Sequence, residues 1–501
     1  MVGLSSAKRE AIICYYDALI LVTPVFGVNT LIPYIGCIPL SDTNFASLKL
    51  ASELLENLST LGYHEMTAIQ AQSLPLILAG KDVIGQGKTG SGKTAAFGLG
   101  LLNKLDVKRF RVQTLVLCPT RELADQVAKE IRRLARATHN VKVLTLCGGM
   151  PFGPQIGSLE HGAHIIVGTP GRVEEHLRKE YLSLADLTTF VLDEADRMLD
   201  MGFQDALDDI IEFMPNKRQT MLFSATFPKR IQSIANRVMI QPEMVKVEST
   251  HDDSTIKQHF FKVDGNEQRP LAVQLLLLRY LPESTVVFCN TKRETDELAE
   301  YLRDNGFSAL SLHGDLEQRE RDQALVRFSN KSVSVMVATD VAARGLDIDA
   351  LDAVINYHIA RDTEVHVHRI GRTGRAGSKG LALSLYSDKE HYKVTQLEEY
   401  LGQRVVPDAL PPEKLLNQEA YEPAMATLQI DGGKKQKVRP GDILGALTGE
   451  DGIEGKQVGK IQMFDNWAYV AVNRDVANVA LTKIARGKLK GRSFRVRRLR
   501  D

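Results

Sequence analysis

The segment Gly87–Thr94 constrains the fold of this chain more than any other. It reads Gly-Lys-Thr-Gly-Ser-Gly-Lys-Thr and follows Asp82–Gly85, which has the character of the end of a buried strand. The spacing G-x-x-x-x-G-K-T is typical of a phosphate-binding loop, because its glycines let successive backbone N–H groups point at phosphate oxygens. In such a loop Lys93 reaches the outer phosphates and the Thr94 hydroxyl can ligate Mg²⁺. The sequence therefore predicts a nucleotide-binding loop, and a plain glycine-rich turn is the weaker interpretation.

An acidic segment, Asp193–Asp196, directly follows a second run of strand-like composition, Phe190–Leu192. In a nucleotide hydrolase the first carboxylate at a strand end, here Asp193, holds the water shell of the metal. An adjacent glutamate, here Glu194, can polarise the attacking water. Acids at this density also occur at the solvated start of a helix. The phosphate-binding loop upstream favours the hydrolase interpretation.

The second half of the chain repeats this organisation. Thr285–Cys289 and Ser334–Ala338 are again β-branched runs that alternate with helical segments. Alternation of this kind is typical of parallel sheets covered by helices. We therefore predict a second α/β lobe.

Further motifs resemble those of the DEAD-box RNA helicases, from Phe45 to about Tyr386. Gly62-Tyr63 followed by Thr67–Gln70 resembles the adenine-reading Q motif, and Gln70 can offer a donor and an acceptor to an adenine edge. The resemblance implies two RecA-like parallel-sheet lobes that bind ATP and Mg²⁺, the metal at Thr94 and Asp193. It assigns nucleotide binding to Phe45, Gln70, Thr89, Gly90, Ser91, Gly92, Lys93, Thr94 and Asp347.

The same resemblance assigns RNA contacts and a coupling function to other motifs of the two lobes. Its RNA contacts are Pro119, Thr120, Arg121, Gly149, Thr169, Pro170, Gly171, Arg172, Gln318, Arg321 and Thr339. Its residues that couple hydrolysis to strand separation are Asp196, Ser224, Thr226 and His368. RNA is expected to be recognised mostly through phosphates and 2′-hydroxyls, with one strand bent so that a short duplex opens locally.

The segment His368–Arg375 resembles the motif that closes on ATP, with Arg372 and Arg375 as arginine fingers. Planar, permanently charged guanidinium groups suit a transition state whose charge is spread over phosphoryl oxygens. A basic RNA-binding turn would also contain these arginines, but it would not explain their order after the preceding motifs. The implied catalytic set is Lys93, Asp193, Glu194, Arg372 and Arg375. Because this site is split between two lobes, closure is expected to be coupled to catalysis, and ATP and RNA to raise each other's affinity.

Positive charge is concentrated near the C-terminus. The whole chain has a formal net charge of only +1, whereas Leu428–Asp501 contains 16 Lys or Arg against 8 Asp or Glu. This balance indicates an RNA-binding surface in the C-terminal region. The basic residues expected to form it are Lys483, Arg486, Lys488 and Lys490, together with Arg492, Arg495, Arg497, Arg498 and Arg500.

The basic region also has the pattern of a folded domain. Its strand-like runs are Thr427–Ile430, Val458–Phe464, Trp467–Val472 and Ser493–Val496. Helical spacing is found in Pro440–Leu447 and Asp475–Lys488. The resulting order, β-α-β-β-α-β, predicts an α+β domain like an RNA-recognition motif. The aromatic-rich sequences that stack bases in such domains are not clearly present, so the basic cluster is expected to bind RNA instead.

A DEAD-box core joined to this tail resembles the DbpA/YxiN group of bacterial helicases, and the lead-in Gln86–Thr89 fits that group. One departure is Gly87, where the group commonly has alanine. The resemblance implies that the tail directs the motor to a hairpin of 23S ribosomal RNA during assembly of the large ribosomal subunit, with large-subunit precursors as partners. A generic basic RNA anchor without hairpin preference is the alternative for the tail.

The remaining segments set the expected domain boundaries. We expect an apolar extension at 1–40, lobe 1 at 41–249, lobe 2 at 250–405, a proline-containing linker at 406–426 and the RNA-binding domain at 427–501. The composition, with 44% hydrophobic and 25% charged residues, is ordinary for a soluble globular protein. A cytoplasmic location is expected, because export would separate the motor from ATP and ribosomes. A monomer is expected, because the two-lobed ATP site needs only one chain.

The first forty residues fit none of these motifs. Ala18–Leu40 is apolar and uncharged, which would suit a signal peptide or a membrane span, but prolines and glycines interrupt it. We expect no membrane function; the preferred hypothesis is that initiation lies near Leu40 or Ser41 and that the extension is a gene-start artefact. The five cysteines have no CxxC spacing, so neither a disulfide nor a metal site is expected.

Three functions are compatible with the motifs: an RNA-stimulated ATPase that remodels ribosomal RNA, a DEAD-box helicase of broad RNA specificity, and an ATP-dependent RNA clamp that rarely turns over. The sequence favours an enzyme, because Glu194 and both arginines are present, whereas a clamp would be free to lose them. The broad-specificity helicase differs from the ribosomal one only in the tail.

Overall fold

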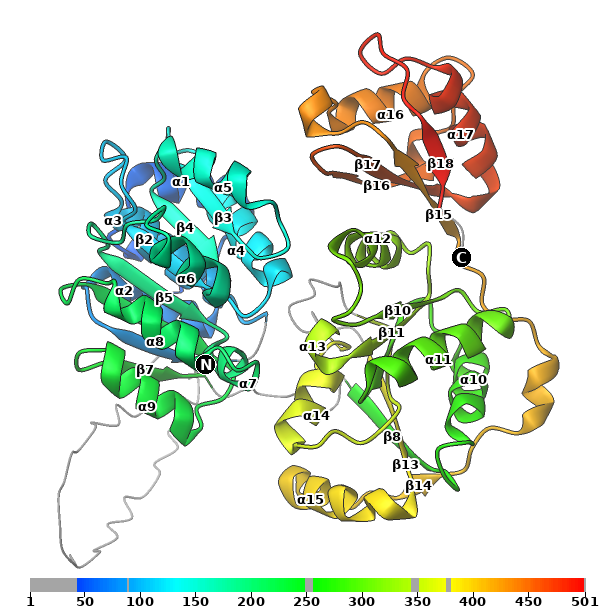
Figure 1. The fold of residues 1–501 in the computed structure, drawn as a ribbon. Helices are drawn as coiled ribbons and strands as arrows, with labels where there is room; N and C mark the ends of the chain where they lie inside the picture. The colour runs from blue at the N-terminus through cyan, green and yellow to red at the C-terminus, as the bar shows by residue number, and fades with distance from the viewer. Residues whose placement is uncertain (1–42, 88–89, 248–255, 344–350, 375–379, 500–501) are drawn as a thin grey trace, which may run out of the picture. The chain divides into compact units, whose positions relative to one another are not determined.

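The computed structural model describes residues 43–87, 90–247, 256–343, 351–374 and 380–499. The N-terminal extension, together with Thr89, Asp347 and Arg375 from the predicted site, lies outside the described residues. Three sheets organise the chain, two with seven strands and one with four. Each sheet carries its own helices (Figure 1). Each also has its own buried apolar residues.

Lobe 1 is a parallel sheet covered by helices on both faces. Its strands are β1 (Val83–Gln86), β2 (Thr114–Leu117), β3 (Val143–Leu146), β4 (Ile165–Gly168), β5 (Thr189–Asp193), β6 (Gln219–Ser224) and β7 (Glu243–Lys246). Its helices are α1 (Ser52–Thr60), α2 (Ala68–Leu78), α3 (Lys93–Lys104), α4 (Arg121–Leu134), α5 (Phe152–Glu160), α6 (Pro170–Arg178), α7 (Ala195–Asp200), α8 (Gln204–Glu212) and α9 (Lys229–Val238), with a short 3₁₀ turn, η1 (Phe45–Ser47).

The sheet of lobe 1 has the order β3-β4-β2-β5-β6-β1-β7. Most of its strands are buried along their whole length, which is why they appear in the sequence as continuous apolar runs. One core cluster lies under α2, α3 and α4, and a second lies under α6, α8 and α9. Because β1, β6 and β5 are neighbours, the loops that follow them lie along one edge of the sheet.

Lobe 2 repeats the architecture. Its strands are β8 (Ile256–Lys262), β9 (Thr285–Cys289), β10 (Ala309–Leu312), β11 (Val335–Thr339), β12 (Ala353–Asn356), β13 (Gly380–Tyr386) and β14 (Pro407–Asp408). Its helices are α10 (Arg269–Tyr280), α11 (Lys292–Asp304), α12 (Gln318–Ser329), α13 (Asp340–Ala343), α14 (Thr363–Ile370) and α15 (His391–Leu401), with 3₁₀ turns η2 (Asp388–Glu390) and η3 (Glu413–Asn417). The order β10-β11-β9-β12-β13-β8-β14 is that of lobe 1 when each set is counted from its own first strand.

The tail domain is an antiparallel sheet with two helices. Its elements are β15 (Met425–Ile430), α16 (Pro440–Thr448), β16 (Val458–Met463), β17 (Ala468–Asn473), α17 (Ala477–Arg486) and β18 (Val496–Arg498), with 3₁₀ turns η4 (Lys434–Gln436), η5 (Gly455–Gln457) and η6 (Arg474–Val476). The sheet order is β16-β17-β15-β18, so the first and third strands are central. The predicted order β-α-β-β-α-β is confirmed.

Two expectations need correction. The last strand was expected at Ser493–Val496 but lies at Val496–Arg498, because Leu489–Arg492 first forms a turn and pairing with β15 starts only at Val496. Part of the predicted linker belongs to lobe 2: Pro407–Asp408 forms the edge strand β14 beside β8, and Leu410 and Leu415 pack on the core. Apolar side chains spaced between prolines hold this segment to the lobe.

Among the described residues, no helix combines the length and the apolar character needed to cross a membrane. Cys118, Cys147 and Cys289 are free and buried. Cys118 and Cys289 lie at or just after strand ends, where a small apolar side chain packs in the core.

Candidate active site

The phosphate-binding loop lies between β1 and α3. Gly90 and Gly92 have φ angles of +84° and +93°, a backbone region that favours glycine, and a Cβ on Gly92 would lie 2.5 Å from Gln70 Nε2. Lys93 is the first residue of α3 and is only 6% exposed. Its Nζ donates a hydrogen bond to the Gly87 carbonyl, at 2.5 Å. The loop therefore positions the Lys93 ammonium against its own backbone, beside the N-terminus of a helix that suits phosphate.

The Q motif is joined to this loop by hydrogen bonds. Gln70 Oε1 accepts from the Thr67 N–H at 2.9 Å, and Gln70 Nε2 donates to the Gly92 carbonyl at 3.1 Å. Thr67 Oγ1 donates to the Ser91 carbonyl at 2.8 Å. Gln70 thus lies against the phosphate loop, and its contact with adenine stays a prediction. Phe45 packs in the lobe 1 core, edge-on to a tyrosine ring, and its contact with a nucleotide stays a prediction.

The two predicted catalytic acids lie at the end of β5, two strands from the loop. Asp193 is the last residue of β5 and is 3% exposed. Glu194 follows with φ +52° and ψ +51°, a left-handed conformation that is uncommon for a non-glycine residue. Strain of this kind is often found at active sites. Glu194 Oε2 accepts a hydrogen bond from Arg197 Nη1 at 2.6 Å, and both side chains are buried.

The surroundings of Asp193 fit a magnesium ion. Burial raises the pKa of Asp193 to about 7, and the positive charge of Lys93 acts in the opposite direction. A carboxylate together with the Thr94 hydroxyl provides the hard oxygen donors that Mg²⁺ prefers. The part of the chain that the structure describes has no group of three or more His, Cys, Asp or Glu that could hold a metal. This donor set suits a metal bound by one or two protein oxygens and by the phosphates of a nucleotide.

The predicted coupling residues of lobe 1 are in direct contact. Asp196 Oδ2 accepts hydrogen bonds from the Thr226 N–H at 3.0 Å and from Thr226 Oγ1 at 2.9 Å. The Asp196 N–H donates to Ser224 Oγ at 3.4 Å. Burial alone would raise the pKa of Asp196, but its hydrogen bonds with Thr226 and the nearby Arg197 charge lower it. Asp196 is therefore held as a carboxylate, and it joins the acidic segment to the end of β6.

The lobe 1 motifs assigned to RNA lie at the carboxyl ends of β2, β3 and β4, which are neighbours in the sheet. Arg121 begins α4, whose N-cap is Thr120, and its guanidinium lies so close to Gly149 that a Cβ there would be 1.9 Å from Nη1. Arg172 Nη1 donates to the Met150 carbonyl at 3.0 Å and to Gln155 Oε1 at 2.9 Å. The structure thus brings Arg121, Gly149 and Arg172 to one edge.

The remaining lobe 1 positions assigned to RNA lie next to these residues in the chain. Pro119 directly precedes Thr120, while Thr169 is the N-cap of α6 and Pro170 and Gly171 form the first turn of that helix.

Lobe 2 places its predicted residues on three elements. Gln318 and Arg321 lie on the first turn of α12, where Gln318 Nε2 donates to Asp322 Oδ1 at 2.9 Å and Arg321 Nη1 donates to the His313 carbonyl at 3.1 Å. Thr339 ends β11. His368 lies on α14, where burial lowers its pKa to about 4.

Arg372 is 6% exposed and lies just after α14, with its N–H bonded to the Arg369 carbonyl at 3.2 Å.

Sequence reasoning missed two buried arginines that anchor the catalytic segments. Arg197 binds Glu194, as described above. Arg369 forms paired hydrogen bonds with Asp340, each at 2.7 Å. Arg197 directly follows the acidic segment, three residues after Glu194, and Arg369 lies inside the segment His368–Arg375, three residues before Arg372. Their position gave a signal, but their burial could not be inferred from one sequence.

In the tail domain the predicted basic residues gather at the end of α17 and in the loop that follows. Arg486, Lys488 and Lys490 are exposed, and Lys483 is half-buried. Lys490 Nζ donates to the Lys437 carbonyl at 2.9 Å. These side chains follow one another along the chain from α17 to the loop before β18.

Comparison with known families agrees with this geometry. Residues 67–234 match the DEAD/DEAH box helicase model, residues 268–377 match the helicase conserved C-terminal domain, and residues 427–498 match the DbpA RNA binding domain. The ATP-dependent RNA helicase DbpA of Escherichia coli is 54% identical over 459 residues, which cover 91% of this chain and 100% of that protein. The chain belongs to the DEAD-box RNA helicases, in the DbpA group.

Other DEAD-box relatives match the two lobes. The helicase CshA of Geobacillus kaustophilus is 44% identical over 357 residues, which cover 71% of this chain and 76% of that protein. S. cerevisiae Dbp5, solved with RNA and ADP BeF3, is 31% identical with a TM-score of 0.66, over 73% of this chain and 96% of that one. As a DEAD-box helicase, the protein is an ATP-dependent, RNA-stimulated ATPase. The assignments of individual residues remain predictions.

Proposed function

We propose that this DEAD-box helicase unwinds short duplexes in ribosomal RNA, and that its tail domain directs the motor to a hairpin of 23S ribosomal RNA in precursors of the large subunit. The observation that carries the proposal is the match of residues 427–498 to the DbpA RNA binding domain, together with full-length similarity to DbpA. The exposed basic surface at Arg486, Lys488 and Lys490 supplies the electrostatic attraction that RNA binding needs. We further propose that the protein acts in the cytoplasm as a monomer.

In the proposed mechanism, ATP lies on the loop between β1 and α3, with Lys93 at the outer phosphates and Gln70 at the base. Mg²⁺, held by Thr94 and Asp193, would neutralise phosphate charge when bound. Glu194, kept in place by Arg197, orients the attacking water. Arg372 and Arg375 stabilise the charge that spreads over the phosphoryl oxygens.

Hydrolysis is coupled to RNA through the contact between the acidic segment and β6. Asp196 holds Thr226 by two hydrogen bonds, so a change at the γ-phosphate reaches the Ser224–Thr226 segment directly. RNA is gripped by backbone contacts at Arg121, Gly149 and Arg172. An RNA clamp remains the alternative function, and the buried Glu194–Arg197 pair favours the enzyme because it keeps the acid in place.

The test is steady-state ATPase activity of the full-length protein with large-subunit ribosomal RNA and with an unrelated structured RNA of the same length. We expect ribosomal RNA to stimulate much more strongly. In a variant with Lys483, Arg486, Lys488 and Lys490 all changed to glutamine, we expect this preference to disappear and the slope of log affinity against log salt to fall by about 3.

The matched control changes Lys434 and Lys435, two other tail lysines, to glutamine and should keep the preference. Equal stimulation of the unmodified protein by both RNAs would overturn the ribosomal assignment and leave a general RNA helicase. A lack of stimulation by either RNA would favour the clamp.

A further inference from the structure

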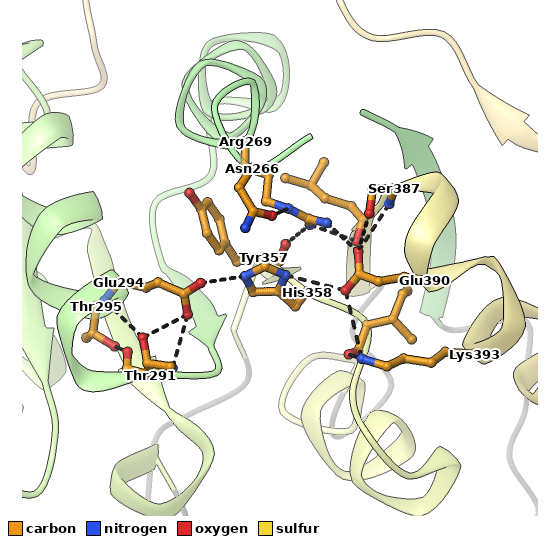
Figure 2. Close-up of polar contacts among 12 residues, drawn as sticks. Asn266, Arg269, Thr291, Glu294, Thr295, Tyr357, His358, Ser387, Glu390 and Lys393 are labelled. Carbon is orange, nitrogen blue, oxygen red and sulfur yellow. Dashed lines mark hydrogen bonds and ion pairs between the residues drawn. The ribbon is translucent and has the colours of Figure 1, made fainter. Parts of the chain in front are cut away.

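A buried histidine in lobe 2 lies between two carboxylates (Figure 2). His358 Nε2 is 2.8 Å from Glu294 Oε1, and His358 Nδ1 is 3.4 Å from Glu390 Oε1. The histidine is 7% exposed. Glu294 lies in the first turn of α11 and Glu390 lies in η2, so the imidazole joins two elements that are far apart in the chain. None of the three residues belongs to a motif that the sequence identified.

The two contacts favour a protonated ring. A carboxylate only accepts hydrogen bonds, and a neutral imidazole has one N–H, so both contacts are satisfied only by an imidazolium. Burial by itself would lower the pKa of His358, but the hydrogen bonds to Glu294 and Glu390 outweigh it and raise the pKa above its usual value. Burial would likewise raise the pKa of Glu390, but His358 and Arg269 lower it to about 2.

Three further basic side chains lie near the imidazole, on α10, α15 and α14. Arg269 on α10 binds Glu390, and Lys393 on α15 lies 3.9 Å from Glu390 Oε1. Arg369 on α14 donates a hydrogen bond to the backbone carbonyl of His358 itself. Burial raises the pKa of the Tyr357 phenol and of the Cys289 thiol.

A second buried histidine, His366 on α14, has its pKa lowered to about 3 by burial and by Arg369. The pKa values of the two histidines are therefore shifted in opposite directions, that of His366 downwards and that of His358 upwards.

The backbone next to His358 anchors the arginine-bearing helix. The His358 carbonyl accepts a hydrogen bond from Arg369 Nη1 at 2.8 Å, and Asn356 Oδ1 accepts from the same nitrogen at 3.2 Å. On its other side the segment is held by Arg269, whose Nη1 donates to the Tyr357 carbonyl. Arg369 is 2% exposed and its carbonyl accepts from the Arg372 N–H. A shift of residues 356–358 would therefore reach Arg372 through Arg369.

We propose that His358 is a positioning residue of the ATPase: as an imidazolium it ties α11 to η2, fixes segment 356–358, and so orients Arg369 and the catalytic Arg372 on the α14 side of the site. This inference rests on the proposed catalytic function of Arg372. Because the stabilising form is the charged one, the effect is present at low pH and is lost as pH rises through the raised pKa of His358. Turnover should therefore fall as the imidazolium loses its proton, since small displacements of catalytic groups slow the reaction strongly.

The test is RNA-stimulated ATPase activity of the full-length protein, with kcat and KM for ATP measured from about pH 6 to about pH 9.5. Three variants are compared: His358→Gln, which hydrogen-bonds but does not titrate, His358→Arg, which keeps a permanent charge, and Arg372→Ala. We expect the wild-type kcat to fall about tenfold on the alkaline side while KM changes little. His358→Gln should show the low kcat at every pH, and His358→Arg should remove the alkaline decline.

The matched control is His259→Gln. His259 also pairs with a carboxylate in lobe 2, with Nδ1 2.7 Å from Asp408 Oδ2, but that pair is at the sheet edge and does not contact Arg369. We expect its pH profile to match the wild type. Thermal unfolding of each variant shows whether the lobe is folded.

The outcomes separate the inference from the proposed function. If folded His358→Gln keeps both the wild-type kcat and its alkaline decline, the positioning function is wrong, even if Arg372→Ala is inactive. If Arg372→Ala keeps full activity, the catalytic assignment of Arg372 is wrong, and with it the inference.

Discussion

The two lobes have the same strand order but use buried charge differently. In lobe 1 three acids, Asp193, Glu194 and Asp196, gather at the phosphate edge, and one arginine, Arg197, holds the middle one. In lobe 2 half-buried acids hold buried basic groups: Asp340 binds Arg369, and Glu390 binds Arg269 and His358. Because the strand order is the same, the fold does not determine whether acidic or basic residues gather in a lobe. The residues in the segments after the strands determine this. Lobe 1 gathers its acids at the end of β5, whereas lobe 2 pairs its acids with arginines and a histidine.

The largest effect expected from this difference is on turnover. Glu194→Gln keeps an acceptor for Arg197 but cannot polarise water as a carboxylate does, so we expect kcat to fall by about 10²- to 10³-fold. RNA affinity in the presence of ATP should stay within a factor of about two, because the RNA edge of lobe 1 is unchanged. ATPase rates and RNA binding measured on the same preparation check both parts. An active Glu194→Gln protein would mean that another group orients the water.

In lobe 2, removal of the buried charge of Arg269 should affect the stability of the lobe more than turnover. Arg269 is fully buried, and its guanidinium binds Glu390 and two backbone carbonyls. Arg269→Met leaves Glu390 with His358, Lys393 and Ser387 as partners, so we expect lobe 2 to lose about 3 kcal/mol of unfolding free energy. Chemical denaturation followed by a probe in lobe 2 measures this, because the lobes need not unfold together.

The matched control for Arg269 is Lys262→Met. Lys262 also pairs with an acid of η2, Asp388, but both side chains are largely exposed. Surface pairs of this type contribute little, so no resolvable change is expected. Equal stabilities of Arg269→Met and Lys262→Met would contradict the contrast between the lobes.

The sequence predicted the parts of this comparison that depend on local pattern. The phosphate loop, the strand ending in Asp193 and the β-α-β-β-α-β tail follow from apolar runs and from glycine spacing within a few residues. The Glu294–His358–Glu390 contacts could not be predicted, since Glu294 and His358 are 64 residues apart and neither residue type is unusual in its own segment. Likewise, the pairing of β14 with β8 could not be predicted, because the prolines of this segment are typical of a linker and the strand depends on packing against lobe 2.

A smaller effect tests how lobe 1 shapes its RNA edge. Gly149 has φ +72°, and a Cβ there would overlap the Arg121 guanidinium, whereas a Cβ on Gly148 would lie 3.6 Å from Nη2. Gly149→Ala should displace Arg121 and weaken RNA binding about tenfold, equivalent to about 1.4 kcal/mol. Gly148→Ala is the matched control and should change affinity little. Fluorescence anisotropy with a labelled single-stranded RNA compares them, and equal affinities of the two variants would show that Arg121 does not need the space.

The smallest expected effect concerns how the two lobes start a helix after a strand. In lobe 1, Thr120 Oγ1 accepts from the Leu123 N–H at 3.3 Å to cap α4. In lobe 2, Thr291 Oγ1 accepts from the Glu294 N–H at 3.2 Å, and Glu294 Oε2 accepts in return from the Thr291 N–H at 3.1 Å. Thr291→Ala should cost about 1 kcal/mol of lobe 2 stability, the usual magnitude for a lost N-cap.

Thr291→Ala has a second consequence that Thr120→Ala cannot have. Thr291 Oγ1 also lies 3.0 Å from Glu294 Oε2, on the carboxylate whose other oxygen binds His358. Loss of this partner frees the Glu294 carboxylate to rotate away from the imidazole, so the alkaline decline in kcat should shift to lower pH in Thr291→Ala. Thr291→Ser keeps the hydroxyl and should restore the wild-type profile. A Thr291→Ala enzyme with an unshifted profile would mean that the backbone N–H of residue 291 alone is enough to hold Glu294 against His358.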